Sequence, residues 1–360
     1  MVFCMKARES VEKMTERDWG PSPSEGIFLN STACVILPPE SVLQAIVASS
    51  KACFNYPDPY KKSLMRSLAG YTGFREENLF VGNGSAKILR VIAECFIENG
   101  DTVLAFNPSF SVFNSAVELM GGEIVELDLL EKQGFAIPFE QVFSLTREKN
   151  VKAIYLANPN NPTGNLLLDE LPLRKLLETG VLVVLDECYC EFSGSSFSGL
   201  VREFDNLIVV RSLSKSFGMT GLRIGYSIAS PEIMRLMTKV ENAIEIFNCS
   251  SVSLDAAVAA LGEQEYYSNG RARGMQLGAK LAGVLEKFGI KCSFQKTPFL
   301  FCHVSAVASA SSFAKALERQ NVFVKCYLDF GDKFVRIGIP GEKDFEKVAI
   351  AVERTVEGLK

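Results

Sequence analysis

The chain has 360 residues, of which 48% are hydrophobic and 22% are charged, and its formal net charge is −4. This length exceeds the size at which one hydrophobic core stops growing, so we expect two domains, and the composition excludes wholesale disorder. The weak acidic charge gives no field for binding nucleic acid, and no apolar run approaches the roughly 20 residues of a membrane span, so we expect neither partner. Residues 1–18 carry mixed charges without an apolar segment, so we expect no signal peptide and a cytoplasmic protein.

Between residues 79 and 210, short apolar segments alternate with helical patterns. We expect strands at residues 79–81, 102–106, 123–127, 151–156, 181–185 and 207–210, and helices at 86–97, 110–120 and 171–178. Near-continuous apolar strands separated by helices are typical of a mostly parallel sheet that is covered on both faces. After residue 231 longer helices predominate, with strands expected at 299–304 and 334–339 and a last helix at 342–357. This change predicts a second, smaller α+β domain.

The cysteine and histidine content limits the chemistry. Ten cysteines without a secretory signal indicate reduced thiols, and none of them are spaced Cys-x-x-Cys. His303 is the only histidine, so a Cys/His zinc site or a serine–histidine–aspartate triad would depend on that one side chain. We therefore expect no metal site and no such triad.

Polar segments follow four of the expected strands. They are Gly-Asn-Gly-Ser at residues 82–85, Asn-Pro-Asn-Asn-Pro-Thr-Gly at 158–164, Asp-Glu-Cys-Tyr at 186–189 and Arg-Ser-Leu-Ser-Lys-Ser at 211–216. Because ligands of such a sheet bind at the carboxyl ends of its strands, we expect the four segments to form one site.

Two of these segments carry the residues that suggest chemistry. Asp186 ends a very apolar strand, where a carboxylate either caps the next helix or faces a cation such as a protonated ring nitrogen. Lys215 lies near Ser212, Ser214 and Arg223, whose hydroxyls and guanidinium suit a phosphate group. A lysine beside such a site, partly desolvated, becomes a usable amine nucleophile, whereas the alternative is an ordinary solvated surface lysine.

Three further features would complete such a site. The glycine turn at residues 82–85 precedes a helix, whose N–H groups and dipole favour an anion. Asn161 and Tyr189 are polar side chains that could bond a phenolate oxygen, and Phe110 supplies an aromatic face. Taken singly, each of the three side chains is equally explained as a turn or core residue.

Together these segments resemble the fold-type I pyridoxal-phosphate aminotransferases. The stretch Ser-Leu-Ser-Lys-Ser-Phe-Gly-Met-Thr-Gly-Leu-Arg-Ile-Gly at residues 212–225 is similar to the lysine signature of that family, and residues 158–164 and 186–192 are similar to two further motifs in the expected order. Asn-Tyr-Pro-Asp-Pro at 55–59 and Phe-Val-Arg-Ile-Gly at 334–338 are similar to motifs near its start and end. The Tyr-Pro-Asp-Pro segment and the short length most resemble the histidinol-phosphate aminotransferase branch, which also contains threonine-phosphate decarboxylase.

The resemblance implies an α/β fold, with a large domain built on a mostly parallel seven-stranded sheet and a smaller α+β domain built from both termini. We place an N-terminal arm and part of the small domain at residues 1–45, the large cofactor-binding domain at 46–245 and the small domain at 246–360. It also implies a homodimer in which Tyr56 reaches the cofactor phosphate of the partner subunit.

The resemblance further assigns roles to individual residues. Lys215 would form the Schiff base with pyridoxal 5′-phosphate and later move the substrate proton, Asp186 would pair with the ring nitrogen, and Tyr189 would hold the ring oxygen. Asn161 would share that contact, and Phe110 would stack on the ring. The phosphate would be held by Tyr56, Gly84, Ser85, Ala86, Lys87, Ser212, Ser214 and Arg223. The substrate would be bound by Arg336, Asn30 and Asn161.

The implied activity is transfer of an amino group from an amino acid or an amino-alcohol phosphate to a 2-oxo acid such as 2-oxoglutarate, within amino-acid and specifically histidine biosynthesis. A pyridoxal-phosphate decarboxylase of the threonine-phosphate type needs the same cofactor site and stays an alternative. A non-catalytic sensor is a third reading, but it would need an added DNA-binding domain, and the short N-terminal segment and acidic charge argue against one.

The chain departs from that branch at four places around the expected cofactor and substrate, one of which is Thr-Pro-Phe at residues 297–299, where Asn-Phe is common. Residues 29–38 replace the usual Asn-Glu-Asn-Pro-x-Gly segment, which predicts a more apolar substrate mouth. Lys87 follows Ala86 where Asp-Glu is common, so it either adds a cation near the phosphate or faces solvent on its helix. Lys325 lies where an arginine is common. The N-terminal stretch with Trp19 forms either a lid over the substrate or a packed arm.

Overall fold

A computed structural model describes residues 6–14, 25–32, 36–294 and 296–359 of the chain. Trp19, and with it the choice between a lid and a packed arm, lies outside these residues. The first described helix, α1 (Glu9–Glu12), lies beside α5 (Val112–Met120), where the Arg8 guanidinium donates to the carbonyl of Leu119 at 2.9 Å.

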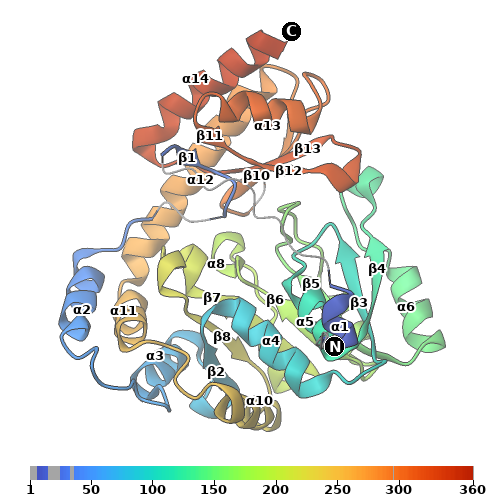
Figure 1. Ribbon diagram of the computed structural model, residues 1–360, viewed down its shortest axis with the longest axis vertical. Helices are drawn as coiled ribbons and strands as arrows, with labels where there is room; N and C mark the ends of the chain where they lie inside the picture. Colours follow the sequence, from blue (N-terminus) through green and yellow to red (C-terminus); the bar gives the residue numbers. More distant parts are fainter. Residues whose placement is uncertain (1–5, 15–24, 33–35, 295, 360) are drawn as a thin grey trace, which may run out of the picture.

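A seven-stranded sheet forms the centre of the large domain (Figure 1). Its strands, in spatial order, are β2 (Leu79–Gly82), β8 (Gly225–Ile228), β7 (Leu207–Ser212), β6 (Leu182–Asp186), β5 (Val151–Ala157), β3 (Thr102–Asn107) and β4 (Glu123–Asp128). Only β8 runs antiparallel to its neighbours, so the expected mostly parallel sheet is confirmed. The sequence predicted six of these strands at nearly the observed bounds, and it missed β8.

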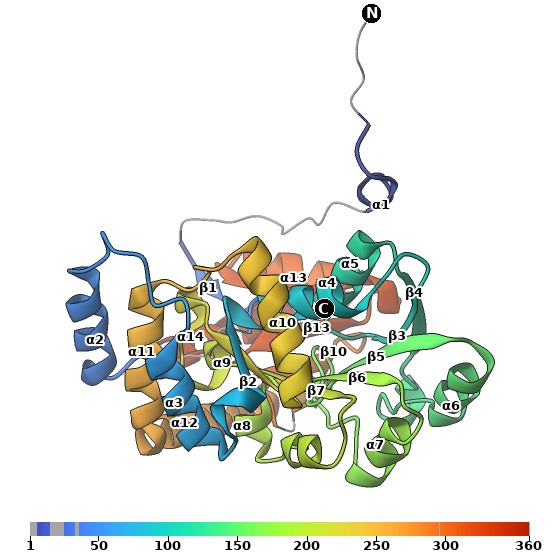
Figure 2. The same cartoon turned by 90° about the horizontal axis from the view of Figure 1, so that it is seen from below.

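Helices cover both faces of this sheet and enclose two hydrophobic cores. One core contains apolar residues of α4 (Gly84–Phe96), α5 and α10 (Pro231–Ile244). The other contains residues of α2 (Glu40–Ser50), α3 (Lys62–Thr72), α6 (Phe139–Glu148), α7 (Glu170–Leu177) and α11 (Ser251–Gly262). Seen from below, α2, α3 and α11 lie at the β2 side of the sheet and α6 lies at the β4 side (Figure 2).

The small domain lies beyond the carboxyl ends of the central strands (Figure 1). It has an antiparallel sheet in the order β12 (Lys325–Tyr327), β13 (Phe334–Gly338), β10 (Phe299–His303) and β9 (Lys291–Ser293), packed against α12 (Gln264–Glu286), α13 (Ala310–Glu318) and α14 (Glu342–Leu359). A short parallel pair joins β1 (Ile27–Phe28) to β11 (Val322–Phe323). The small domain is therefore built from both ends of the chain, as expected.

Two helices connect the domains across the predicted boundary at residue 245. Residues of α11, such as Ala256 and Ala257, pack in the large-domain core although they follow that boundary. The long α12 reaches both cores. Near its start, Tyr267 packs in the large-domain core, and near its end, Leu281 and Leu285 pack in the small-domain core. Within the described ranges, no helix combines the length and the apolar content required to cross a bilayer.

Candidate active site

A cavity of about 200 Å³ lies at the carboxyl ends of β5, β6 and β7, beside the first residues of α4. The four polar segments expected to meet do meet here, because these strands are parallel and end at the same edge of the sheet. The lining residues that the sequence predicted are Ser85, Ala86, Phe110, Asn161, Asp186, Tyr189, Ser212, Ser214, Lys215 and Arg223. The lining residues that it missed are Thr32, Ala157 and Cys188.

Asp186, the last residue of β6, places a carboxylate in the wall of this cavity. Its Oδ1 accepts from the Cys188 N–H at 2.9 Å and its Oδ2 accepts from the Tyr155 hydroxyl at 3.1 Å. It does not cap the next helix, α8 (Cys190–Ser193), because no side chain makes a capping hydrogen bond at the N-cap position, Tyr189. Burial raises the pKa of Asp186 above its ordinary value, and the hydrogen bonds from Cys188 and Tyr155 oppose that shift only in part. A cation in the cavity would therefore stabilise the charged form of the Asp186 carboxylate, which burial alone disfavours.

Lys215 lies in α9 (Leu213–Ser216), one short turn that follows β7. Its Nζ donates to the Thr32 Oγ1 at 2.7 Å, so the amine points into the cavity and the surface-lysine alternative does not hold. The Tyr189 hydroxyl donates to the same Thr32 oxygen at 2.9 Å. Burial raises the pKa of Tyr189, which keeps that side chain a neutral phenol at physiological pH.

An anion-binding corner forms where α4 begins. Gly84 has φ +77°, and a Cβ there would lie 2.4 Å from the Arg223 guanidinium, so only glycine permits this close approach. The Arg223 NH1 donates to the Ser214 hydroxyl at 3.3 Å, and the Ser212 hydroxyl accepts from the Ser214 N–H at 3.1 Å. In the part of the chain that the structure describes, Arg223 makes no ion pair with a carboxylate. Hydroxyls, a guanidinium and a helix N-terminus together suit a phosphate dianion.

Besides Gly84, two residues that the resemblance assigned to the phosphate lie outside the wall of this cavity. The Lys87 side chain is only 9% exposed and its Nζ pairs with Glu245 at 3.0 Å, so it does not face solvent. Tyr56 is 82% exposed and stacks on Phe247, with 4.6 Å between the ring centroids. Neither side chain lines the cavity of its own chain.

The three predicted substrate residues also come together. Arg336 is buried in β13, where its NH1 donates to the Asn161 Oδ1 at 2.6 Å and its NH2 donates to the backbone carbonyl of Asn30 at 2.6 Å. Asn30 therefore contributes its carbonyl oxygen rather than its side chain. The sequence missed two neighbours of Arg336: Tyr327, whose hydroxyl accepts from NH1 at 3.2 Å, and Phe299, whose ring centroid lies 5.6 Å from the guanidinium carbon.

Asn160 organises the loops that carry Phe110 and Asn161. Its Nδ2 donates to the carbonyl of Pro108 at 2.9 Å, and its Oδ1 accepts from the Ser109 hydroxyl at 2.8 Å. The sequence pattern pointed to Asn161, the second asparagine of the Asn-Asn pair. The first one is fully buried and ties the two loops together.

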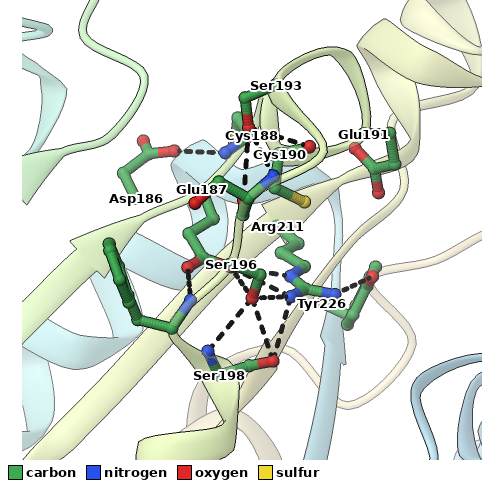
Figure 3. Close-up of polar contacts among 12 residues, drawn as sticks. Asp186, Glu187, Cys188, Cys190, Glu191, Ser193, Ser196, Ser198, Arg211 and Tyr226 are labelled. Carbon is green, nitrogen blue, oxygen red and sulfur yellow. Dashed lines mark hydrogen bonds and ion pairs between the residues drawn. The ribbon is translucent and has the colours of Figure 1, made fainter. Parts of the chain in front are cut away.

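A buried ion pair supports the site from the opposite face of the sheet (Figure 3). Glu187 follows Asp186 and is 0% exposed, and its Oε2 accepts from the Arg211 NH2 at 2.9 Å and Nε at 3.1 Å. The Ser196 hydroxyl and the Phe197 N–H also donate to this carboxylate. Because side chains alternate along a strand, Glu187 and Arg211 point away from the cavity that their neighbours Asp186 and Ser212 line. The pair therefore fixes the ends of β6 and β7 to each other.

Within the residues that the structure describes, no group of three or more histidine, cysteine, aspartate or glutamate side chains is arranged to hold a metal ion. The polar groups of the cavity include an amine, hydroxyls and a guanidinium, which can donate to an organic phosphate, and one carboxylate, which can accept from a protonated ring nitrogen.

Comparison with known proteins agrees with this geometry. The family model described as aminotransferase class I and II matches residues 24–354. The histidinol-phosphate aminotransferase of Methanosarcina barkeri is 32% identical over 351 residues, which covers 96% of this chain and 92% of that protein. The one from Thermoanaerobacter pseudethanolicus is 36% identical over 217 residues, a stretch that spans 61% of its length.

Among solved structures, the histidinol-phosphate aminotransferase of Sinorhizobium meliloti in complex with pyridoxal-5′-phosphate has a TM-score of 0.86 and 22% identity. The alignment covers 99% of this chain and 98% of that one, so the two share a fold. With the family model matched over nearly the whole chain and the motif residues gathered in one cavity, this chain belongs to the class I and II aminotransferase family.

Proposed function

We propose that the protein is a pyridoxal-phosphate-dependent aminotransferase that holds its cofactor covalently on Lys215. The observation that carries the proposal is one cavity that contains an inward-pointing amine, a buried carboxylate and an anion-binding corner. Pyridoxal 5′-phosphate has an aldehyde, a basic ring nitrogen and a phosphate, and it supplies a conjugated sink for the electrons of the bond that breaks at the substrate α-carbon. The three features of the cavity match these three groups in kind.

Different residues of the cavity would hold different parts of the cofactor. Ser85, Ser212, Ser214 and Arg223, with the N-terminus of α4, would bind the phosphate, and Phe110 would cover one face of the ring. Asp186 would keep the ring nitrogen protonated. Two opposite charges about 3 Å apart attract by roughly 5 kcal/mol at an effective dielectric near 20, which favours the carboxylate that burial disfavours. Tyr189 and Asn161 would orient the ring through its oxygen.

Arg336 would bind the carboxylate of the amino acid or of the 2-oxo acid. Its planar fork suits two parallel hydrogen bonds to a carboxylate, and its Nε is buried without a hydrogen-bond partner in the described residues. The donor would be an amino acid or an amino-alcohol phosphate of the histidinol-phosphate type, and the acceptor a 2-oxo acid such as 2-oxoglutarate, because the relatives named above are histidinol-phosphate aminotransferases. Those names favour transamination over decarboxylation, and they support a place in histidine biosynthesis. We place the protein in the cytoplasm as part of this proposal.

The working form would be a homodimer in which Tyr56 reaches the phosphate bound by the partner subunit. Support comes from the exposure of this segment, where Phe54, Tyr56 and Tyr60 are all more than 70% exposed. Large exposed aromatic side chains that gather on one segment are typical of an interface. Tyr56→Phe should weaken cofactor binding about tenfold, the value of one charge-assisted hydrogen bond, while size-exclusion chromatography still gives a dimer. A monomeric wild-type protein would refute the arrangement.

Borohydride reduction tests the central assignment. Incubation with pyridoxal 5′-phosphate followed by reduction should fix the cofactor on the peptide that contains Lys215, as detected by mass spectrometry. Lys215→Ala should give no such adduct, whereas Lys239→Ala, an exposed lysine on α10, should label like the wild type. Label at another lysine in the Lys215→Ala protein would overturn the proposal.

A half-reaction screen identifies the amino donor. The cofactor-loaded protein is mixed with single amino acids and phosphorylated amino alcohols, and the loss of cofactor absorbance is followed. Recovery of pyridoxamine phosphate without CO₂ would identify a transaminase, and CO₂ release without pyridoxamine phosphate would instead identify a decarboxylase.

A further inference from the structure

Thr32 lies in the cavity wall, in a segment where the chain departs from the branch that it most resembles. The residue is 6% exposed and lines the same cavity as Asp186 and Lys215. Its hydroxyl oxygen accepts from the Lys215 Nζ at 2.7 Å and from the Tyr189 hydroxyl at 2.9 Å. One small side chain thus connects two side chains that the proposed reaction uses.

The two accepted hydrogen bonds define the orientation of this hydroxyl. A threonine hydroxyl has two acceptor lone pairs and one O–H, so two donors occupy both lone pairs and direct the O–H toward a third group. The amine and the phenol approach the same oxygen. With the cofactor bound, the single Tyr189 O–H would donate to the ring oxygen, and the Thr32 O–H would then donate to the phenol oxygen while Thr32 still accepts from Lys215. Because one N–H of a primary amine is held by Thr32, rotation about the last bond of the Lys215 side chain is restricted and the nitrogen lone pair keeps one direction.

The position of Thr32 depends on the small domain. The preceding residues pair with β11, where the Ile27 N–H donates to the carbonyl of Asn321 and the Leu29 N–H to that of Phe323, both at 2.8 Å. The next residue, Asn30, accepts from Arg336. Lys215 and Tyr189, in contrast, follow strands β7 and β6 of the large domain. Thr32 is therefore a direct link between the substrate-binding side and the reactive amine.

We propose that Thr32 is a positioning residue for Lys215 during proton transfer, an inference that rests on the proposed function. The relevant state is the one in which the Lys215 amine is not bonded to the cofactor. The amine lone pair takes the proton from the substrate α-carbon and forms a new N–H bond. The cofactor would supply the sink for the electron pair of the broken C–H bond, and the resulting Lys215 ammonium would still donate to Thr32. Thr32 itself neither gains nor loses a proton.

Thr32→Val tests the proposal, because valine keeps the branched shape and removes the hydroxyl. We expect the cofactor dissociation constant, measured by absorbance titration of the cofactor-free protein, to stay within about threefold of wild type. The rate of the proton-transfer half-reaction should fall about 100-fold, within the usual contribution of a positioned acid–base group. The α-deuterium isotope effect on that half-reaction should rise, since proton transfer becomes more fully rate-limiting, and KM should change much less than kcat. Thr32→Ser should recover at least a tenth of the wild-type rate.

Thr355→Val is the matched control. Thr355 is a buried threonine of α14 whose hydroxyl accepts from the Gln320 Nε2 at 3.2 Å, far from the cavity wall. It should lose comparable stability and keep the wild-type rate and isotope effect. If Thr32→Val proves too unstable, Thr32→Ala replaces it with the same measurements.

The outcomes separate the two proposals. A wild-type rate and isotope effect in Thr32→Val would overturn the role of Thr32, and so would an equal loss of cofactor affinity and rate, which would indicate a structural role. If the wild-type protein itself forms no reducible adduct at Lys215, the proposed function fails rather than the inference about Thr32.

Discussion

Removing Arg211 while leaving Glu187 in place should strongly destabilise the large domain. The Arg211 NH2 and the Glu187 Oε2 are 2.9 Å apart, a separation at which two unit charges attract by about 6 kcal/mol at an effective dielectric of 20. Much of that attraction offsets the cost of removing both ions from water. In Arg211→Met the carboxylate keeps the Ser196 hydroxyl and the Phe197 N–H but loses its counter-charge, so we expect a loss of about 3–5 kcal/mol.

Urea unfolding followed by far-ultraviolet circular dichroism measures this loss. The double variant Glu187→Gln/Arg211→Met should recover at least about 2 kcal/mol of it, because no charge is then left buried. Burial raises the pKa of the Glu187 carboxyl, and the nearby Arg211 opposes that rise only in part. Because this pKa is higher in the folded protein than in the unfolded chain, the free energy of unfolding falls as the pH rises through the folded-state pKa. The deficit of Arg211→Met should accordingly be smaller at pH 5 than at pH 8.

An exposed ion pair provides the control for this prediction. Arg235 pairs with Glu232 on the solvent side of α10, so Arg235→Met should change stability by less than about 0.5 kcal/mol. A loss below about 1 kcal/mol in Arg211→Met, or no recovery in the double variant, would refute the reasoning that the pair fixes β6 to β7.

Three further changes test other parts of the site. Asp186→Asn should stabilise the cofactor-free protein at neutral pH by on the order of 1 kcal/mol, because burial raises the pKa of this carboxyl. The gain in the free energy of unfolding should grow as the pH rises from about 3.9, the pKa in the unfolded chain, through the higher pKa of the folded protein. An equal gain at pH 4 and pH 7.5 would contradict this reasoning. Arg336→Lys should raise KM for carboxylate substrates about tenfold or more with unchanged cofactor absorbance, since lysine lacks the planar fork; an unchanged KM would remove Arg336 from substrate binding. Treatment with oxidised glutathione should link Cys292 to Cys302, which lie opposite each other on β9 and β10 with their sulfurs 2.9 Å apart; peptide mapping that finds both thiols intact would exclude it.

The parts of the fold that the sequence predicted are those with a local signal. The five parallel strands and β2 are short apolar runs, and a polar segment follows four of them, so both their bounds and the rim of the site could be read directly. Strand β8 has no such signal: it is only Gly-Tyr-Ser-Ile, it directly follows the lysine motif, and its place between β2 and β7 depends on pairing with β2, far away in sequence.

The residues that the sequence missed in the site act through distant partners. Thr32 contacts Lys215 across 183 positions, and its segment carries no motif. Tyr155 reads as one more apolar residue of β5 until its hydroxyl is seen to bond Asp186. Lys87 was open between the phosphate and solvent because its actual partner, Glu245, follows six further strands in the sequence. Periodicity and local motifs describe which way a side chain points, but not which distant side chain it meets.

The site combines two layers that different parts of the chain supply. The groups suited to the cofactor, such as Asp186 and Lys215, are carried by the rim of the large sheet, and the Glu187–Arg211 pair holds that rim from behind. The groups suited to the substrate are brought by the small domain and the residues before α2, with Arg336 and Thr32 as their contacts to the rim. Substitutions in the second layer can therefore change which amino donor is accepted without disturbing the cofactor. This division gives a physical reason why the chain keeps the cofactor motifs while residues 29–38 and Lys325 depart from the branch that it most resembles. We therefore expect exchanges in the small domain and the N-terminal segment to alter the choice of amino donor.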